Sequence, residues 1–277
     1  MLRDIFVHLP VYGGPDAGVD YALSVARNFS AHITGIAFAL EPQIPPSYYG
    51  TIPTEFLVEN RQQAEKAAAT ASNRFMETAR LAGIPVETRT ATLTIDGAAD
   101  AFGRLARLFD IAVVTQPSPD RAGIEATILE AALFESGRAV LVVPYVQKQP
   151  LKLDRVLVAW DGSRAATRAI AEAKPFLAKA KHVEILVIES GKTDPKALPG
   201  ADLARHLARH NLKVELRRVV AAPGQDVEST ILNEISDRDV DFVVMGGYGH
   251  SRLREFVLGG VTRGMISSMT APVLMAH

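Results

Sequence analysis

Glycines near the C-terminus are spaced in a way that could hold a phosphate group. Gly246, Gly249 and Gly259 form the pattern Gly-x2-Gly-x9-Gly after an apolar, β-branched run, and a short helical pattern starts at Gly260. Glycine lets backbone N–H groups crowd around an anion, because no Cβ intrudes and positive φ angles are accessible. A helix N-terminus adds unpaired donors and the positive end of a dipole. On spacing alone, a phosphate cradle and an ordinary turn before a helix are equally favoured.

Two other phosphate-binding motifs are absent from the sequence. No Gly-x4-Gly-Lys-Ser/Thr occurs, so no lysine or hydroxyl is placed as in a Walker A loop. The glycines also do not form the Gly-x-Gly-x-x-Gly that follows the first strand of a dinucleotide-binding fold. If these glycines hold a phosphate, they do so in a different loop.

The elements that must position these glycines occur twice along the chain. Similar segments recur in the two halves, at 2–7 and 153–158, at 109–114 and 240–244, and at 138–144 and 270–275. Between the halves, the polar segment 145–150 ends in proline and indicates a linker. The repeat predicts two copies of one structural unit.

Short runs rich in valine and isoleucine predict parallel strands that are buried on both faces. In the first half the expected strands are 3–9, 32–39, 86–91, 110–115 and 139–143, and the expected helices are 16–29, 54–82, 97–108 and 124–136. In the second half the expected strands are 154–160, 182–188, 213–219, 241–245 and 271–275, and the expected helices are 164–179, 199–210, 225–237 and 260–269. This alternation predicts right-handed crossovers and two doubly wound α/β domains.

Composition narrows the classes of function. The 277 residues suffice for two domains, and 48% apolar and 22% charged residues are typical of a folded soluble protein. The net charge of −1 gives no field that would favour nucleic acid or an anionic membrane, so neither is expected as a partner. The absence of cysteine excludes disulfides, thiol catalysis and cysteine-based zinc sites. No signal peptide or apolar run of ~20 residues is evident, so we expect a cytoplasmic protein.

The glycine loop and its flanks resemble the universal stress protein family, whose nucleotide loop is Gly-x2-Gly-x9-Gly followed by Ser or Thr. Segments 239–246 and 270–275 are similar to the last two strands of that family. The resemblance spans nearly the whole chain, but it is specific only in the C-terminal loop. It implies a tandem universal stress protein, with Rossmann-like domains at residues 1–146 and 151–277 that each have a parallel five-stranded sheet.

The same resemblance implies how the two domains associate. Single-domain relatives form dimers through their last strand, so we expect Val140–Val143 to pair with Val273–Met275 in an intramolecular pseudo-dimer. Such pairing would also cover two sheet edges. A homodimer of the tandem chain stays open as a further level of assembly.

Transferred residue by residue, the resemblance implies one nucleotide site, in the second domain. Asp161 matches an acidic residue that helps to hold the nucleoside, and Ala159 and Ile188 match the apolar wall beside adenine. The residues implied to surround the nucleotide are Ala159, Asp161, Ile188, Met245, Gly246, Gly249, Gly259, Gly260, Val261 and Thr262. ATP or a related adenine nucleotide is the expected ligand, with Mg²⁺ as a companion of its phosphates.

Two of these residues carry an open alternative. Gly260 stands where the family usually has Ser or Thr, which removes one hydroxyl, and Thr262 could replace that hydroxyl in part. From the residues alone, Asp161 is also a candidate N-cap, because Asp-Gly-Ser precedes a predicted helix. One carboxylate has two oxygens, so it can serve both purposes.

The first half lacks the residues that correspond to this nucleotide site. Pro10 falls where Asp161 falls, and a segment containing Pro117 and Pro119 replaces the first glycine turn. Proline cannot donate a backbone N–H group, so these residues argue against a phosphate site there. We therefore expect a degenerate first domain.

Other interpretations of the chain stay open. Asp202, His206 and His210 are spaced along one face of a predicted helix, where two histidines could bind a metal ion, but no third and fourth ligand can be identified. No positioned base and no metal carboxylate pair are evident, so we expect a binding protein that acts in stress response, with at most weak ATP hydrolysis. The alternatives are a module that binds a protein or a small apolar ligand, and an ATP-consuming enzyme of the same architecture.

Overall fold

The computed structural model describes residues 1–12, 16–42, 53–118, 123–189, 200–222, 224–247 and 260–277. The chain divides into two compact units, residues 2–138 and residues 139–277. Both alternate strands with helices around a mostly parallel sheet, as the sequence predicts. Each unit is described by itself below.

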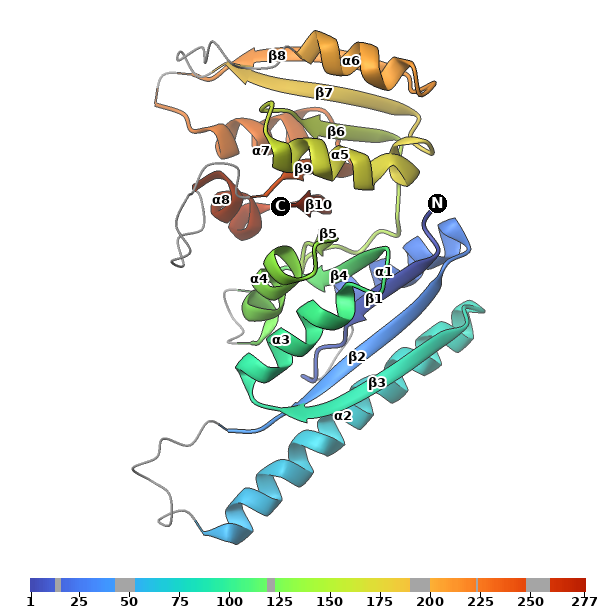
Figure 1. Ribbon diagram of the computed structural model, residues 1–277, viewed down its shortest axis with the longest axis vertical. Coiled ribbons are helices and arrows are strands. Elements are labelled where there is room, and N and C mark those ends of the chain that lie inside the picture. Colours follow the sequence, from blue (N-terminus) through green and yellow to red (C-terminus); the bar gives the residue numbers. More distant parts are fainter. Residues whose placement is uncertain (13–15, 43–52, 119–122, 190–199, 223, 248–259) are drawn as a thin grey trace. The chain divides into compact units, whose positions relative to one another are not determined.

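Residues 2–138 form a parallel sheet with helices on both faces. Its elements are β1 (Asp4–His8), α1 (Ala17–Phe29), β2 (His32–Leu40), α2 (Thr54–Ala82), β3 (Val86–Leu93), α3 (Ile95–Ala106), β4 (Ile111–Thr115) and α4 (Glu125–Glu135). The strand order is β3-β2-β1-β4. Helices α1 and α2 cover one face of this sheet, and α3 and α4 pack together on the other (Figure 1). The predicted helix 54–82 is confirmed as α2.

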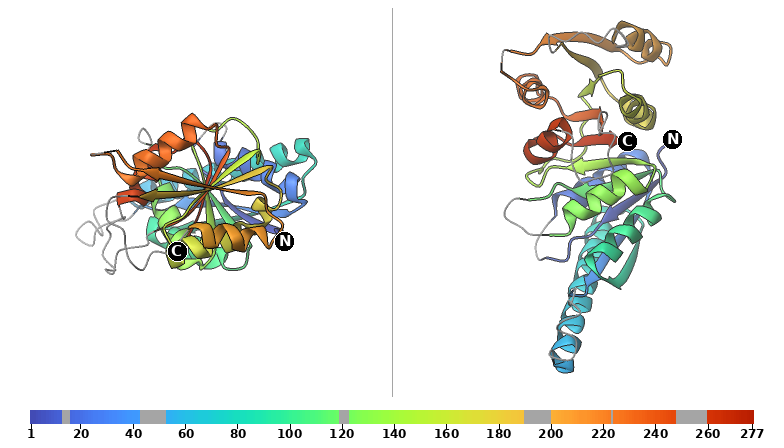
Figure 2. Two further views of the ribbon diagram at one scale, coloured as in Figure 1. Left: turned by 90° about the horizontal axis from the view of Figure 1, so that it is seen from above. Right: turned by 60° about the vertical axis from the view of Figure 1, so that its left-hand side comes forward.

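The core of this unit is aromatic on the face that α3 covers. The ring of Phe6 stacks on those of Phe102 and Phe109, with centroids 4.7 Å away in both cases. Strands β1 and β4 are almost wholly buried, because helices cover both faces. By contrast, the first turns of α2 extend beyond the strands (Figure 2), and its buried residues begin only at Ala68.

Residues 139–277 contribute six strands to the ten-stranded sheet. Its elements are β5 (Ala139–Val143), β6 (Arg155–Ala159), α5 (Arg164–Leu177), β7 (His182–Glu189), α6 (Gly200–Ala208), β8 (Val214–Val220), α7 (Val227–Asp237), β9 (Phe242–Gly246), α8 (Gly260–Ser268) and β10 (Val273–Ala276). The strand order is β5-β10-β9-β6-β7-β8. The part β8-β7-β6-β9 repeats the order β3-β2-β1-β4 of the first unit.

The position of β5 differs from the expectation of one five-stranded sheet in each domain. Strand β5 is antiparallel to β10, with Val142 opposite Val273 and Val140 opposite Met275. The predicted pairing of these two strands is therefore confirmed. The expected separate five-stranded sheets are not, because the strand order joins all ten strands in one sheet, in which β5 neighbours both β4 and β10.

Candidate functional site

The carboxyl end of β6 leads into a tight turn that starts α5. Gly162 has a φ of 77°, which only glycine adopts without strain, and Ser163 is the N-cap whose side chain accepts from the Ala166 N–H. The Oδ1 atom of Asp161 accepts from the Ser163 N–H at 2.9 Å. The alternative that Asp161 caps the helix is therefore wrong: Asp161 braces the turn with one oxygen, and its exposed carboxylate keeps a second oxygen for a ligand.

Strand register places three predicted wall residues on one face of the sheet. Ala159 is opposite Leu186 of β7 and Met245 of β9, so these side chains point the same way. Ile188 lies two residues beyond Leu186 and therefore shares its face. Ala159, Ile188 and Met245 thus share one face at the carboxyl end of three adjacent strands, where Ala159 and Ile188 are half-buried and Met245 is buried.

Gly246 permits a close approach between the end of β9 and the first turn of α5. A Cβ added at Gly246 would lie 2.5 Å from the Ala166 nitrogen and 2.9 Å from the Ala165 carbonyl carbon. Neither atom is at the end of a flexible side chain that could move aside. Gly246 is thus needed for helix–strand packing, whether or not it also contacts a phosphate.

The second predicted anion turn is described only from the start of α8. Gly260 is exposed at the first position of this helix, Val261 is half-buried and Thr262 is buried. Gly249 and Gly259 lie outside the described residues. The first turn of any α-helix has N–H groups without intrahelical partners, and here that turn lies at Gly260 and Val261. A Cβ added at Gly260 would meet none of the described atoms within 4 Å.

Sequence reasoning missed a contact at the end of β9. The Gly247 N–H donates to the Ala276 carbonyl at 2.8 Å, and the Nδ1 atom of His277 lies 3.2 Å from the Gly247 carbonyl oxygen. Both backbone groups of Gly247 are therefore engaged, one with the last residue of β10 and the other with the residue after it. No sequence signal separates Gly247 from its neighbours, because the contact depends on strand order.

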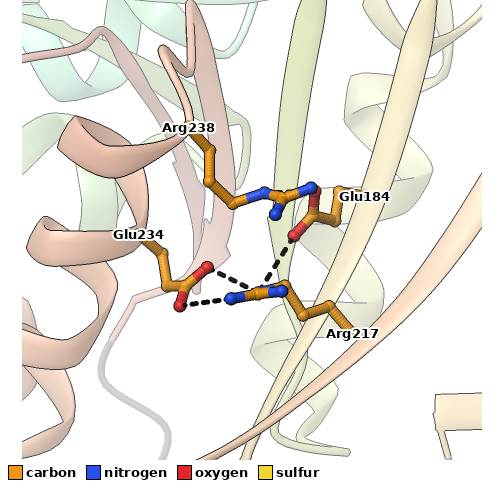
Figure 3. A network of polar contacts seen from close by, with 4 residues as sticks. All are labelled: Glu184, Arg217, Glu234 and Arg238. Atoms are coloured by element: carbon orange, nitrogen blue, oxygen red, sulfur yellow. Dashed lines mark hydrogen bonds and ion pairs between the residues drawn. The ribbon is translucent and has the colours of Figure 1, made fainter.

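Sequence reasoning also missed a polar network that joins α7 to β7 and β8 (Figure 3). Buried Glu184 of β7 accepts from the Arg238 Nε–H at 2.9 Å, and Arg217 of β8 donates twice to Glu234 of α7, at 2.6 and 3.1 Å. The Arg217 Nε atom also lies 3.6 Å from Glu184. Its hydrogen bond to Glu234 raises the pKa of Arg217. Because Glu184 is near the amino end of β7, the network fixes α7 to the sheet away from Ile188.

The first unit fills the corresponding positions with its own side chains. His8 is the last residue of β1 and corresponds to Ala159, the last residue of β6. On the neighbouring strand, Phe38 lies two residues beyond the residue paired with His8 and so corresponds to Ile188. The His8 ring stacks on Phe38 at 6.0 Å and meets Phe102 edge-on at 6.1 Å. Burial lowers the pKa of His8 to about 4, so the ring is neutral at pH 7. The positions that match Ala159 and Ile188 are therefore part of a packed core in the first unit.

In the first unit, side chains also fill the strand end that corresponds to Gly246. Thr115 ends β4, and its hydroxyl donates to the Oδ1 atom of Asp16 at 2.6 Å. Buried Glu125 is the first residue of α4, and the Tyr12 hydroxyl donates to its carboxylate. A carboxylate thus occupies the helix end where a phosphate would be favoured. The expected lack of a phosphate site in the first half stays a prediction.

The predicted helix 199–210 ends earlier than expected: His206 lies on α6, whereas His210 lies two residues beyond its last residue, Ala208. The rings of His206 and His210 lie 4.9 Å apart, and Asp202 forms an ion pair with Arg205. Within the described part of the chain, no three His, Cys, Asp or Glu side chains are grouped so that they could hold a metal ion. The same described residues contain no helix that is long and apolar enough to cross a membrane.

The fold is that of structures described as universal stress proteins. A universal stress protein from Archaeoglobus fulgidus DSM 4304 is similar over 98% of this chain and 97% of its own, with a TM-score of 0.65 and 17% identity. At this identity, the likeness concerns the fold alone.

Sequence comparisons find similar proteins with the same description. Residues 152–277 match the model of the universal stress protein family. Universal stress protein Slr1230 of Synechocystis is 27% identical over 224 residues, which is 78% of this chain and 72% of the relative. Universal stress protein YxiE of Bacillus subtilis is 26% identical over 147 residues, which covers 45% of this chain and 99% of the relative.

Proposed function

We propose that the chain is a tandem universal stress protein whose domain 151–277 binds ATP or a related adenine nucleotide. The observation that carries this proposal is the layout at the carboxyl ends of β6, β7 and β9, where an apolar face, an exposed carboxylate and a helix start occur together. Ligands of open α/β sheets bind at such strand ends. The match of 152–277 to the family supports the same assignment.

In this proposal each part of the site meets a different part of the nucleotide. The apolar face of Ala159, Ile188 and Met245 packs against the adenine ring, and Asp161 accepts hydrogen bonds from the ribose or base. Backbone amides of the glycine loop and of the α8 start bind the phosphates, with Gly246, Gly249, Gly259, Gly260, Val261 and Thr262 around them. Mg²⁺ would accompany the phosphates and supply positive charge against them.

We infer a role in binding rather than in dedicated catalysis. Phosphoryl transfer needs a positioned base or water, a cation against the leaving oxygen, or both. The described residues offer no group in such a role at the ends of β6, β7 and β9. Weak hydrolysis is compatible with phosphates held by amides. We further propose domains at 1–146 and 151–277 that form a pseudo-dimer, and a cytoplasmic stress-response role with neither nucleic acid nor membrane as partner.

The first test is mass analysis of small molecules released from freshly purified, denatured protein. We expect about one adenine nucleotide per chain, because only the second domain has the site. The double variant Gly249→Val, Gly259→Val should lose the nucleotide while its circular dichroism spectrum stays the same. Retention of nucleotide by that folded variant would overturn the site, and a protein that neither retains nor binds ATP would favour a non-nucleotide interaction module.

A further inference from the structure

A pocket of about 310 Å³ lies in the first unit, between α1 and α2 at the end of β1. Leu9, Val19 and Phe75 supply apolar lining, and Leu9 and Phe75 are themselves almost fully buried. We call this the α1–α2 pocket. Its volume is at the lower end of the range typical for small-molecule sites. It is formed entirely by residues 2–138, so it is separate from the nucleotide site proposed above.

Charged groups in the α1–α2 pocket give it an acidic side. Asp16 and Asp20 line it from α1 and its N-cap, and Arg74 lines it from α2. Asp16 is held in place, because its Oδ1 atom accepts from the Val19 N–H at 3.0 Å and from the Thr115 hydroxyl at 2.6 Å. Arg74 already has a contact within the protein. Two carboxylates against one guanidinium leave the lining net negative.

Asp20 is an exposed residue of α1, so its carboxylate is only partly removed from solvent. Among the described residues, its side chain has no hydrogen bond or ion pair. Burial raises the pKa of Asp20, and repulsion from Asp16 raises it further. A positive charge beside Asp20 would relieve both effects, because an opposite charge favours the ionised carboxylate.

We propose that the α1–α2 pocket binds a small organic cation, namely a protonated primary amine that carries a compact apolar body. The apolar body packs against Leu9, Val19 and Phe75, and the ammonium group lies beside Asp20 and Asp16. Anionic ligands are disfavoured, because these carboxylates would repel them. This inference does not depend on nucleotide binding by the second domain.

The test uses 2-phenylethylamine and its neutral analogue 2-phenylethanol, titrated calorimetrically into the full chain saturated with ATP. We expect saturable binding of the amine at about pH 7, and binding of the alcohol that is about tenfold weaker or more, since a lost charge pair of ~1.4 kcal/mol is a factor of ten. Equal affinity for both compounds, or no saturable binding of the amine, would overturn the proposal.

Two variants locate the binding. Asp20→Asn keeps the shape of the side chain and should weaken amine binding about tenfold, whereas Asp237→Asn, an exposed acid at the end of α7, should leave it unchanged. Thr78→Leu places extra carbon atoms in the pocket lining and should weaken the amine and the alcohol together. Circular dichroism shows that each variant is folded. Unchanged amine affinity in folded Asp20→Asn would assign the binding to another place.

Discussion

The ends of β4 and β9 show the same close approach of strand to helix, with the small residue on opposite sides. At β9 the small residue is Gly246 of the strand, against Ala165 and Ala166 of α5. At β4 it is Gly18 of α1, and a Cβ there would collide with the Thr115 hydroxyl. The first arrangement leaves the strand end without a side chain, whereas the second fills it. A repeated unit can therefore keep the same helix–strand packing with a different side chain at the strand end.

The same contrast holds one strand away. Ala159 at the end of β6 is small, whereas His8 at the end of β1 is a buried ring between Phe38 and Phe102. The two units thus place different side chains at the same position of the sheet, and a buried ring there fills the space that the proposed ligand would need. The variants described below test this contrast by changing one residue at a time.

The largest effect on stability is expected when Gly246, which ends β9, is replaced by threonine, the residue type that ends β4. Gly246→Thr forces a Cβ within 2.5 Å of the Ala166 nitrogen, so α5 must shift. We expect the free energy of unfolding to fall by about 3 kcal/mol or more, as in strained overpacked cores. Urea unfolding measures this, with Gly260→Thr as the matched control because an added Cβ there meets none of the described atoms. Similar losses in both variants would contradict the steric explanation.

Acid should destabilise the His8 core. The pKa of His8 is about 4 in the folded protein, against an ordinary value of 6.5 for histidine, so between these pH values the unfolded chain binds a proton that the folded chain does not. The free energy of unfolding should therefore fall as the pH is lowered from 6.5 to 4, and His8 should account for roughly 3 kcal/mol of this loss. His8→Leu should lose less over the same range. Urea unfolding of both proteins at each pH tests this, and equal losses would refute it.

Removing the Thr115 hydroxyl should have a smaller effect. Thr115→Val keeps the shape of the side chain but removes the hydrogen bond to Asp16, which is the N-cap of α1. A hydrogen bond to a charged group in a partly buried site is worth about 1–2 kcal/mol. Thermal unfolding should show the loss. Thr167→Val on α5 is the control, because its exposed hydroxyl only donates to the carbonyl of Ser163.

The smallest effect on stability is expected at the start of α8. Gly260→Ser restores the hydroxyl that the family pattern has, in space that the described residues leave open. We expect a change in unfolding free energy of about 0.5 kcal/mol or less and ATP affinity that rises a few-fold, equivalent to ~1 kcal/mol. Titration with ATP measures the affinity. Weaker binding of ATP would mean that the bare glycine is itself required there.

The sequence predicts well those features that depend on local pattern. Apolar runs gave the strands, helix 54–82 agrees with α2, and the resemblance to relatives gave the pairing of β5 with β10. Features that depend on which distant side chains meet were missed. The Glu184–Arg217–Glu234–Arg238 network joins two strands, a helix and the residue after it, and no spacing in the sequence connects them.

The candidate site shows the same limit. Asp161 was assigned two roles, and the structure gives the N-cap to Ser163, because a positive φ at Gly162 moves the helix start by two residues. That His8 and Phe38 fill the end of the sheet in the first unit could not be predicted without the register of β1 against β2. Gly249 and Gly259, which carry most of the motif, lie outside the described residues and stay a prediction.

The pairing of β5 with β10 has a consequence for how the protein is made. Strand β5 leaves the ribosome before all of residues 144–272, yet its antiparallel partner is β10. Throughout that interval the apolar edge of β5 has no β10 to pair with, and such edges invite pairing with other nascent chains. Slow translation of the second half would lengthen this exposure. Chaperone demand during synthesis should therefore depend on the second half, even for the folding of a strand encoded in the first.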